Sequence, residues 1–185
     1  YEPVQVLNLL DEWDWTGISG NHEAMLLDWE NISKRKAIMS KYGSGISIAN
    51  DNLSKLQLKR LKDMPNKLSL NIENKKIILC HGSPWNMNEY IYPDSKIYKI
   101  KKMFESESDF DYLFFGHTHY PTIWNMGKRR IVNPGSVGQP RDKTPGACWV
   151  LWDTEKNKIR FFREKYNINN LIRMCKKYNP DIKYL

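Results

Sequence analysis

The chain contains four histidines, and each lies in a short turn next to glycine or directly after a predicted strand. Imidazole is the commonest protein ligand of Zn-, Mn-, Fe- and Ni-type ions. Glycine beside such a ligand lets the backbone pass close to a metal or a phosphate. These turns are therefore predicted to bind metal ions or a phosphate. The pair His117 and His119 could serve one metal or two neighbouring metals. The strings are Gly20-Asn21-His22-Glu23, Cys80-His81-Gly82 and Gly116-His117-Thr118-His119.

The elements that must position these turns follow from hydrophobic periodicity and turn residues. Apolar residues that recur every three to four positions predict helices over 3–13, 24–41, 52–64, 94–105 and 169–177. The third of these helices would be capped by Asp51 or Asn52. Short apolar or alternating runs predict strands over 15–19, 67–73, 77–80, 112–115, 122–125, 130–132, 147–153 and 158–166. Helices and strands mixed in this order favour an α/β sandwich, and 185 residues suit a single domain over 1–185.

Composition excludes several classes of protein. Hydrophobic residues make up 41% of the chain and charged residues 27%, an ordinary globular balance. No run approaches the roughly 20 apolar residues of a membrane span, so we expect no membrane partner and a cytoplasmic location. The three cysteines are scattered, which argues against a disulfide framework.

Positive charge is concentrated towards the end of the chain. The net charge is +8, and the residues from Thr154 onward hold nine Lys or Arg against three acidic residues. Such a stretch favours phosphate-bearing partners, although a solvated surface in a Lys-rich protein is the simpler interpretation.

Taken in order, the histidine strings resemble the later metal-binding motifs of calcineurin-like metallophosphoesterases. Two further strings resemble the small bacterial and archaeal phosphodiesterase branch of that superfamily, and the resemblance covers roughly residues 1–153. They are His81-Gly82-Ser83-Pro84 with the downstream Glu89-Tyr90-Ile91-Tyr92-Pro93, and Asn133-Pro134-Gly135-Ser136-Val137-Gly138-Gln139-Pro140-Arg141.

The resemblance implies a four-layer α-β-β-α sandwich and a role for each site residue. Asn21, His81 and His117 would ligate one divalent metal and His119 a second. His22 would contact the phosphate as a general acid or transition-state stabiliser. The two metals (Mn, Fe, Ni or Zn) would clamp the phosphate and acidify a bridging water that hydrolyses the P–O bond. The expected function is a metal-dependent phosphoesterase, most of all a phosphodiesterase.

The sequence departs from the family pattern at its start. The family opens with an Asp-x-His strand end and a Gly-Asp turn, and neither occurs here. We therefore expect an N-terminal βαβ segment to be missing from this chain. Without its carboxylates, we expect weak or mononuclear metal binding and little activity from these 185 residues.

Residues outside the histidine strings complete the predicted substrate site. Arg141 is a candidate phosphate contact, and Trp85, Tyr90 or Tyr92 could stack on a nucleobase or aryl leaving group. Surface exposure of Arg141 and plain packing of the aromatic rings are the alternatives. Residues 133–136 are expected to shape a tight turn near the site through the backbone.

Two other functions remain open on the sequence. A degenerate, non-catalytic member would bind a partner or nucleic acid through the basic C-terminal stretch. A structural zinc protein is a weaker alternative, because no cysteines lie at ligand spacing. The partner of the enzyme would be a phosphoester, including nucleotides and nucleic acid.

Overall fold

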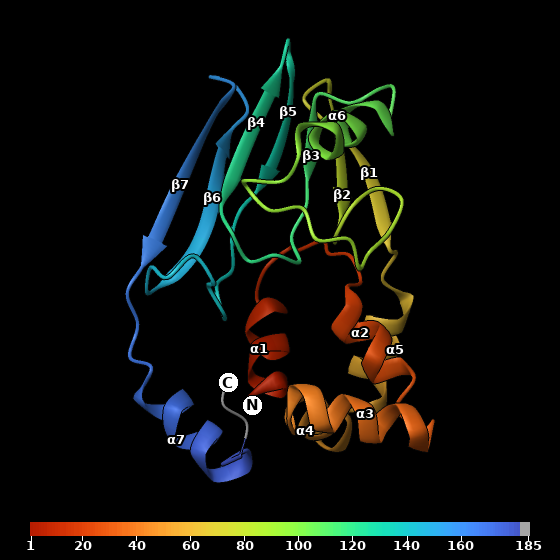
Figure 1. Ribbon diagram of the computed structural model, residues 1–185, viewed down its shortest axis with the longest axis vertical. Helices are drawn as coiled ribbons and strands as arrows, with labels where there is room; N and C mark the ends of the chain where they lie inside the picture. Colours follow the sequence, from red (N-terminus) through yellow and green to blue (C-terminus); the bar gives the residue numbers. More distant parts are fainter. Residues whose placement is uncertain (182–185) are drawn as a thin grey trace. The chain divides into compact units, whose positions relative to one another are not determined.

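The computed structural model describes residues 1–181 and divides into two compact units. Unit 1 comprises Tyr1–Pro65 together with the chain from Asn167 onward, and unit 2 comprises Asn66–Tyr166. Unit 1 is helical, whereas unit 2 contains all of the strands (Figure 1). The predicted single domain over 1–185 stays a prediction.

Unit 1 is built from amphipathic helices around a small apolar core. The helices are α1 (Pro3–Leu10), α2 (Asn21–Leu27), α3 (Ile32–Tyr42), α4 (Gly45–Asn52), α5 (Lys55–Asp63) and α7 (Asn169–Tyr178). Their buried apolar side chains meet in one cluster: Leu7, Leu26, Trp29, Ile38, Ile46, Leu53 and Leu61. The predicted first and last helices are confirmed, with α1 ending three residues earlier than expected.

The single helix predicted over 24–41 is wrong, because the chain forms two helices there. A turn at 28–31 separates α2 from α3. The side chain of Asn31 accepts a hydrogen bond from Lys34 N–H at 3.2 Å, which caps the start of α3. Gly43 ends α3 with φ of 75°, a positive value that glycine adopts without strain.

The helix predicted over 52–64 is confirmed as α5, but its start was misplaced. The cap is Ser54, whose hydroxyl accepts from Gln57 N–H while the Gln57 side chain accepts from Ser54 N–H. This reciprocal pair satisfies two backbone donors. Asp51 and Asn52 instead belong to α4, a helix that the sequence pattern did not predict.

The strand predicted over 15–19 is also wrong. Within the described residues this segment has no ladder partner, and its Ser19 N–H bonds to Pro65 O at 2.9 Å. Trp15 packs beside Gly17 and beneath the Arg60 guanidinium, 4.3 Å from its ring. A short apolar run therefore serves as a packed connection, because strand formation needs a neighbour to pair with.

Unit 2 contains a mixed five-stranded sheet in the order β1-β2-β3-β5-β4. The central strands β2, β3 and β5 are parallel, and the outer strands β1 and β4 are antiparallel to their neighbours. The turn between β1 and β2 uses Glu73 and Asn74 at positive φ, which suits a tight hairpin. The strands are β1 (Lys67–Ile72), β2 (Lys75–Cys80), β3 (Tyr112–Phe114), β4 (Thr122–Met126) and β5 (Arg129–Asn133).

Alternation along the central strands assigns the two faces of this sheet to different layers. On one face, Leu113 and Ile131 pack against Met103 and Phe104 of helix α6 (Ile97–Glu105). On the other face, Tyr112 lies 4.4 Å, centroid to centroid, from Trp152 of a separate two-stranded sheet. That sheet pairs β6 (Ala147–Asp153) with β7 (Lys158–Glu164). Unit 2 thus has helix, sheet and sheet layers, and the predicted α/β class is confirmed.

Within residues 1–181, no helix has the length and apolar character needed to cross a bilayer.

The packing of α6 predicts a difference between two of its apolar side chains. Met103 is 0% exposed, so Met103→Ala should lower the free energy of unfolding by about 2–5 kcal/mol through lost burial and a residual cavity. Ile97→Ala on the same helix is the matched control; Ile97 is 67% exposed and should change stability by no more than about 0.5 kcal/mol. Urea denaturation followed by circular dichroism measures both, and equal losses would contradict this packing.

Candidate functional site

Three parallel strands of unit 2 deliver the predicted site residues to one edge of the sheet. His81 directly follows β2, the string from Gly116 to His119 follows β3, and Asn133 ends β5. Because the carboxyl ends of parallel strands lie at the same edge, these residues converge. Backbone bonds continue beyond the strands: Gly116 N–H donates to His81 O at 2.7 Å, and Phe115 N–H donates to Val132 O at 2.9 Å.

His81 and His117 meet directly. Nε2 of His81 lies 3.0 Å from Nδ1 of His117, and the ring planes are inclined at 63°. One ring can donate a hydrogen bond to the other at this distance. The two nitrogens are also close enough to share a cation, since nitrogen ligands about 2.1 Å from one ion are about 3.0 Å apart at an octahedral right angle and about 3.4 Å apart at a tetrahedral angle. His117 is buried, whereas His81 is half-buried.

The turn that carries two of the histidines has a strained backbone. His117 has φ of 64° and His119 has φ of 63°. Residues other than glycine rarely adopt these left-handed values. Between them, Thr118 N–H donates to Gly116 O at 2.7 Å. Such conformations cost on the order of 1–3 kcal/mol each and persist only where surrounding contacts enforce them.

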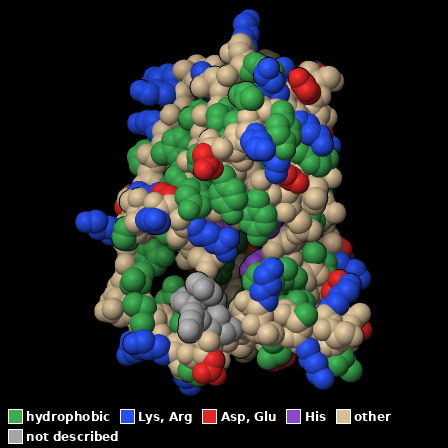
Figure 2. Space-filling view, viewed as in Figure 1, with side chains coloured by type: hydrophobic (Ala, Val, Ile, Leu, Met, Phe, Trp, Pro, Cys, Tyr) green, Lys and Arg blue, Asp and Glu red, His purple; other side chains and the backbone are tan. Residues whose placement is uncertain are grey.

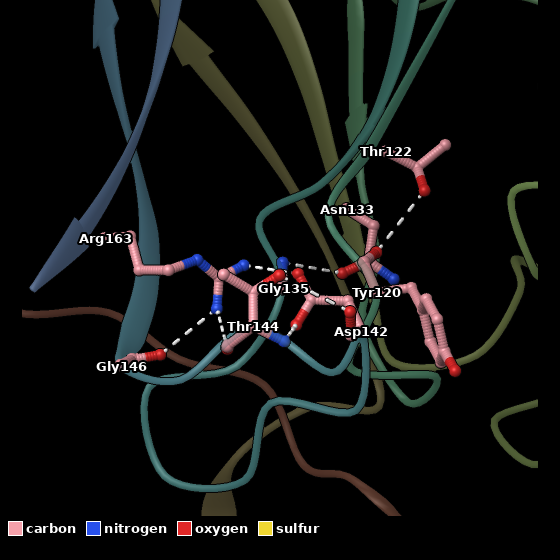
Figure 3. A network of polar contacts seen from close by, with 8 residues as sticks. All are labelled: Tyr120, Thr122, Asn133, Gly135, Asp142, Thr144, Gly146 and Arg163. Carbon is pink, nitrogen blue, oxygen red and sulfur yellow. Dashed lines mark hydrogen bonds and ion pairs between the residues drawn. The ribbon is translucent and has the colours of Figure 1, made fainter. Parts of the chain in front are cut away.

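Asn133 supplies those contacts. Its side chain is fully buried, and Nδ2 donates to Gly116 O and to Thr118 Oγ1, both at 3.0 Å. Its Oδ1 accepts from Gly135 N–H at 2.9 Å (Figure 3). One amide therefore joins the histidine turn to the turn after β5. These bonds agree with the turn expected over residues 133–136, and its role beside a functional site stays a prediction.

The loop after Asn133 reaches His119. Nδ1 of His119 lies 2.7 Å from Gln139 O. A carbonyl oxygen only accepts, so Nδ1 carries the proton and the lone pair of the neutral ring is on Nε2. Arg141 N–H also bonds to His119 O, at 3.4 Å, which places Arg141 beside this histidine. The structure therefore brings two predicted residues together, although the exposed Arg141 guanidinium donates to Gln139 Oε1 at 3.2 Å.

The far end of the same loop is fastened to β7. The Arg163 guanidinium forms an ion pair with Asp142 and donates to Thr144 O at 2.7 Å and Gly146 O at 3.3 Å (Figure 3). Both partners of the ion pair are largely shielded from solvent, with exposed side-chain fractions of 21% and 16%. The loop that contacts His119 is thus held at both of its ends.

Trp85 lies among packing residues of unit 2. Its ring packs against the apolar cluster under α6, and Lys102 Nζ lies 4.2 Å from the ring centroid. Its predicted contact with substrate stays a prediction. Cys80, next to His81, supplies no nucleophile, because burial raises the pKa of its thiol to about 12.

Asn21 and His22 belong to unit 1, where they open α2. Asn21 is buried, and the His22 ring lies 5.5 Å from that of Tyr42 in an edge-on arrangement. Glu23 Oε2 accepts from Gly20 N–H at 2.8 Å, so Glu23 caps the helix. His22 and Glu23 also line an apolar cavity of about 380 Å³ between α1, α2, α4 and α5.

The described donors fit a metal only in part. Across residues 1–181, no group of three or more His, Cys, Asp or Glu side chains is arranged to hold an ion. The donor set that does converge is the nitrogen pair of His81 and His117. Two imidazoles suit a Zn-, Mn-, Fe- or Ni-type ion but leave its charge uncompensated.

The role of Asn133 predicts a loss of stability when its amide is removed. Asn133→Ala leaves Gly116 O and Thr118 Oγ1 buried without this donor, so the free energy of unfolding should fall by about 2–4 kcal/mol. Asn125→Ala on the neighbouring β4 is the matched control, because Asn125 is exposed. Chemical denaturation of both variants decides the matter. A loss of unfolding free energy no larger than that of the control would show that the histidine turn is stable without the Asn133 amide.

Comparison with known proteins identifies the family. The model of the calcineurin-like phosphoesterase superfamily domain matches residues 2–157. An uncharacterised protein of Methanocaldococcus jannaschii is 28% identical and aligns over 90% of this chain and 71% of its own length. Serine/threonine-protein phosphatase 2 of Escherichia coli is 22% identical over 76% of this chain and 71% of its own length.

Solved structures show the same fold. A hypothetical protein of Pyrococcus horikoshii superposes with a TM-score of 0.79 at 20% identity, covering 97% of this chain and 74% of the other. A metallophosphoesterase of Sphaerobacter thermophilus superposes with a TM-score of 0.69 at 23% identity, covering 86% and 70%. With the match over residues 2–157, this chain belongs to the calcineurin-like phosphoesterase superfamily.

Proposed function

We propose that this protein is a metal-dependent phosphoesterase, and more specifically a phosphodiesterase that hydrolyses P–O bonds. The observation that carries the proposal is the pair of imidazole nitrogens 3.0 Å apart at the carboxyl edge of a parallel sheet. Because this chain belongs to the calcineurin-like superfamily, the family match supports placing a metal and a phosphate here in this proposal.

Within this proposal the histidines of unit 2 are metal ligands. His81 and His117 share one divalent ion, and His119 offers Nε2 to a second, because Gln139 O holds its other nitrogen protonated. Mn, Fe, Ni and Zn all suit imidazole ligands. When bound, the ions would neutralise the phosphate charge and acidify a water molecule.

From unit 1, the proposal takes Asn21 as a further metal ligand and His22 as the residue that contacts the phosphate. His22 would stabilise charge in the transition state or donate a proton to the leaving oxygen. Arg141 is proposed as an anion contact because its backbone is bonded to His119. Its guanidinium would exchange the Gln139 side chain for a phosphate oxygen, a stronger acceptor.

The charge of the chain supports an anionic partner. The net charge is +8, and Lys and Arg side chains outnumber Asp and Glu across the face in Figure 2. A positive surface attracts phosphoesters over several ångströms. We propose a soluble phosphoester, including a nucleotide or the end of a nucleic acid, as the substrate, and the cytoplasm as the location.

A non-catalytic binding role is the second candidate, favoured by one observation. The described residues include no group of three or more ligands arranged around a metal. Lys176 and Lys177 lie in the last turn of α7, where cations are also favourable. Binding of a short single-stranded RNA that weakens with added salt and is lost in the Lys176→Ala, Lys177→Ala double variant would favour this function.

Hydrolysis and metal content together test the proposed enzyme. The protein as the cell makes it, with any residues that precede Tyr1, should bind Mn²⁺, Fe²⁺, Ni²⁺ or Zn²⁺ and hydrolyse bis-p-nitrophenyl phosphate. His117→Ala should lower kcat/KM by about 100-fold or more and reduce metal content, because a ligand is lost. The matched control is Asn125→Ala, which leaves both unchanged. Hydrolysis that persists in the His117 variant, or absence of hydrolysis with every ion, would reject the proposal.

A further inference from the structure

Tyr90, Ile91 and Tyr92 lie in an irregular segment after the loop that follows His81. Ile91 is 1% exposed and packs in the apolar cluster under α6. Tyr90 and Tyr92 flank it and are 41% and 36% exposed. Burial therefore alternates along these three residues, and the two exposed tyrosines stack on each other rather than on the core.

These two tyrosines extend the histidine pair into a row of aromatic rings. The Tyr90 ring centroid lies 4.1 Å from that of His117. Tyr90 and Tyr92 are parallel within 11° at 5.8 Å, and Tyr92 meets Tyr120 edge-on at 5.6 Å. Tyr120 itself follows His119 in the chain. We call Tyr90, Tyr92 and Tyr120 the aromatic row. It begins at His117 and passes beside the turn that carries His117 and His119.

Local contacts hold the row in place. A Cβ on Gly82 would lie 2.5 Å from Met87 O and 2.8 Å from Glu89 O, so only glycine allows the 83–89 loop to pack on the residue after His81. Lys99 Nζ binds Glu89 Oε1 at 2.5 Å, which fastens the loop to α6. After the row, Ser95 Oγ accepts from Tyr92 N–H at 2.8 Å. The rings are therefore positioned before any ligand arrives, which lowers the entropic cost of binding.

Packing does not account for the exposed ring surface. In the same stretch of chain Trp85 is packed on the core cluster, so core filling is already provided by a neighbouring aromatic residue. Tyr90 and Tyr92 are 41% and 36% exposed, so part of their aromatic surface remains open to solvent. Planar rings bind such surfaces by stacking, whichever base or aryl group they belong to.

We propose that the aromatic row binds the planar ring of an aromatic phosphoester, a nucleobase or an aryl group, whose phosphate lies at His81 and His117. This inference rests on the proposed phosphoesterase function for the position of the phosphate. It deepens that function by naming the substrate class: esters that carry a flat ring next to the phosphate, rather than purely aliphatic esters.

Three phosphodiesters separate ring binding from catalysis. The aryl arm is bis-p-nitrophenyl phosphate, the nucleobase arm is the dinucleotide ApA, and the aliphatic arm is glycerophosphocholine. Tyr90→Leu and Tyr92→Leu keep apolar bulk but remove the ring, so KM for the ring-bearing esters should rise about 5- to 150-fold, the worth of a stacking contact. KM for glycerophosphocholine should stay unchanged.

The controls test whether the effect belongs to the ring. Tyr90→Phe should restore the KM for ring-bearing esters, because its ring remains. Tyr98→Leu on α6, where Tyr98 is 59% exposed, should change nothing. A rise for ApA alone identifies a nucleobase as the ligand, and a rise for the aryl ester alone identifies an aryl group; either supports the inference. Equal rises for all three esters, or none, would overturn it.

A binding measurement keeps this inference separate from the proposed enzyme. Adenosine is mixed with EDTA-treated protein, and saturation-transfer NMR reports contact with its base. Contact in the original protein, lost in Tyr90→Leu and kept in Tyr98→Leu, supports the row even if no ester is hydrolysed. If esters are hydrolysed but adenosine does not bind and the KM ratios do not change, the phosphoesterase stands and the aromatic row is rejected.

Discussion

One buried amide at the end of β5 maintains the turn on which the candidate site depends. The turn holds His117 and His119 at positive φ, a conformation that the local sequence does not favour. Asn133 offsets that cost by donating to Gly116 O and Thr118 Oγ1 while it accepts from Gly135 N–H. A single side chain thus joins the ends of β3 and β5, and the backbone bond from Gly116 to His81 adds the end of β2.

The rest of unit 2 supports this junction from both faces of the sheet. Leu113 and Ile131 pack one face of the sheet against α6, whereas Tyr112 on the other face packs against Trp152 of the β6–β7 sheet. Strands packed on both sides are rigid, so the loops at their ends start from well-defined positions. The ion pair between Arg163 and Asp142 then fastens the long loop that contacts His119. Rigid strands and fastened loops together give a site formed largely in advance.

Membership in the calcineurin-like phosphoesterase superfamily is carried by the match over residues 2–157 and by the fold. The proposals about metal binding and substrate class have a different physical basis. The proposed metal binding rests on the nitrogen pair of His81 and His117, and the proposed substrate class rests on the exposed rings of Tyr90 and Tyr92. The two features adjoin, because the Tyr90 ring lies 4.1 Å from that of His117.

Local patterns in the sequence determined the strands, most helices and the histidine turns, because hydrophobic period and glycine placement act over a few residues. They failed where distant partners decide: residues 15–19 form no strand for lack of a neighbour, and 24–41 is divided at a turn capped by Asn31. The family and the candidate ligands could likewise be read from short strings. Only the tertiary structure placed Asn133 beneath the histidine turn, Tyr90 against His117 and Trp85 in the packing under α6. These contacts join segments tens of residues apart, and sheet order and packing, not local sequence, bring such segments together.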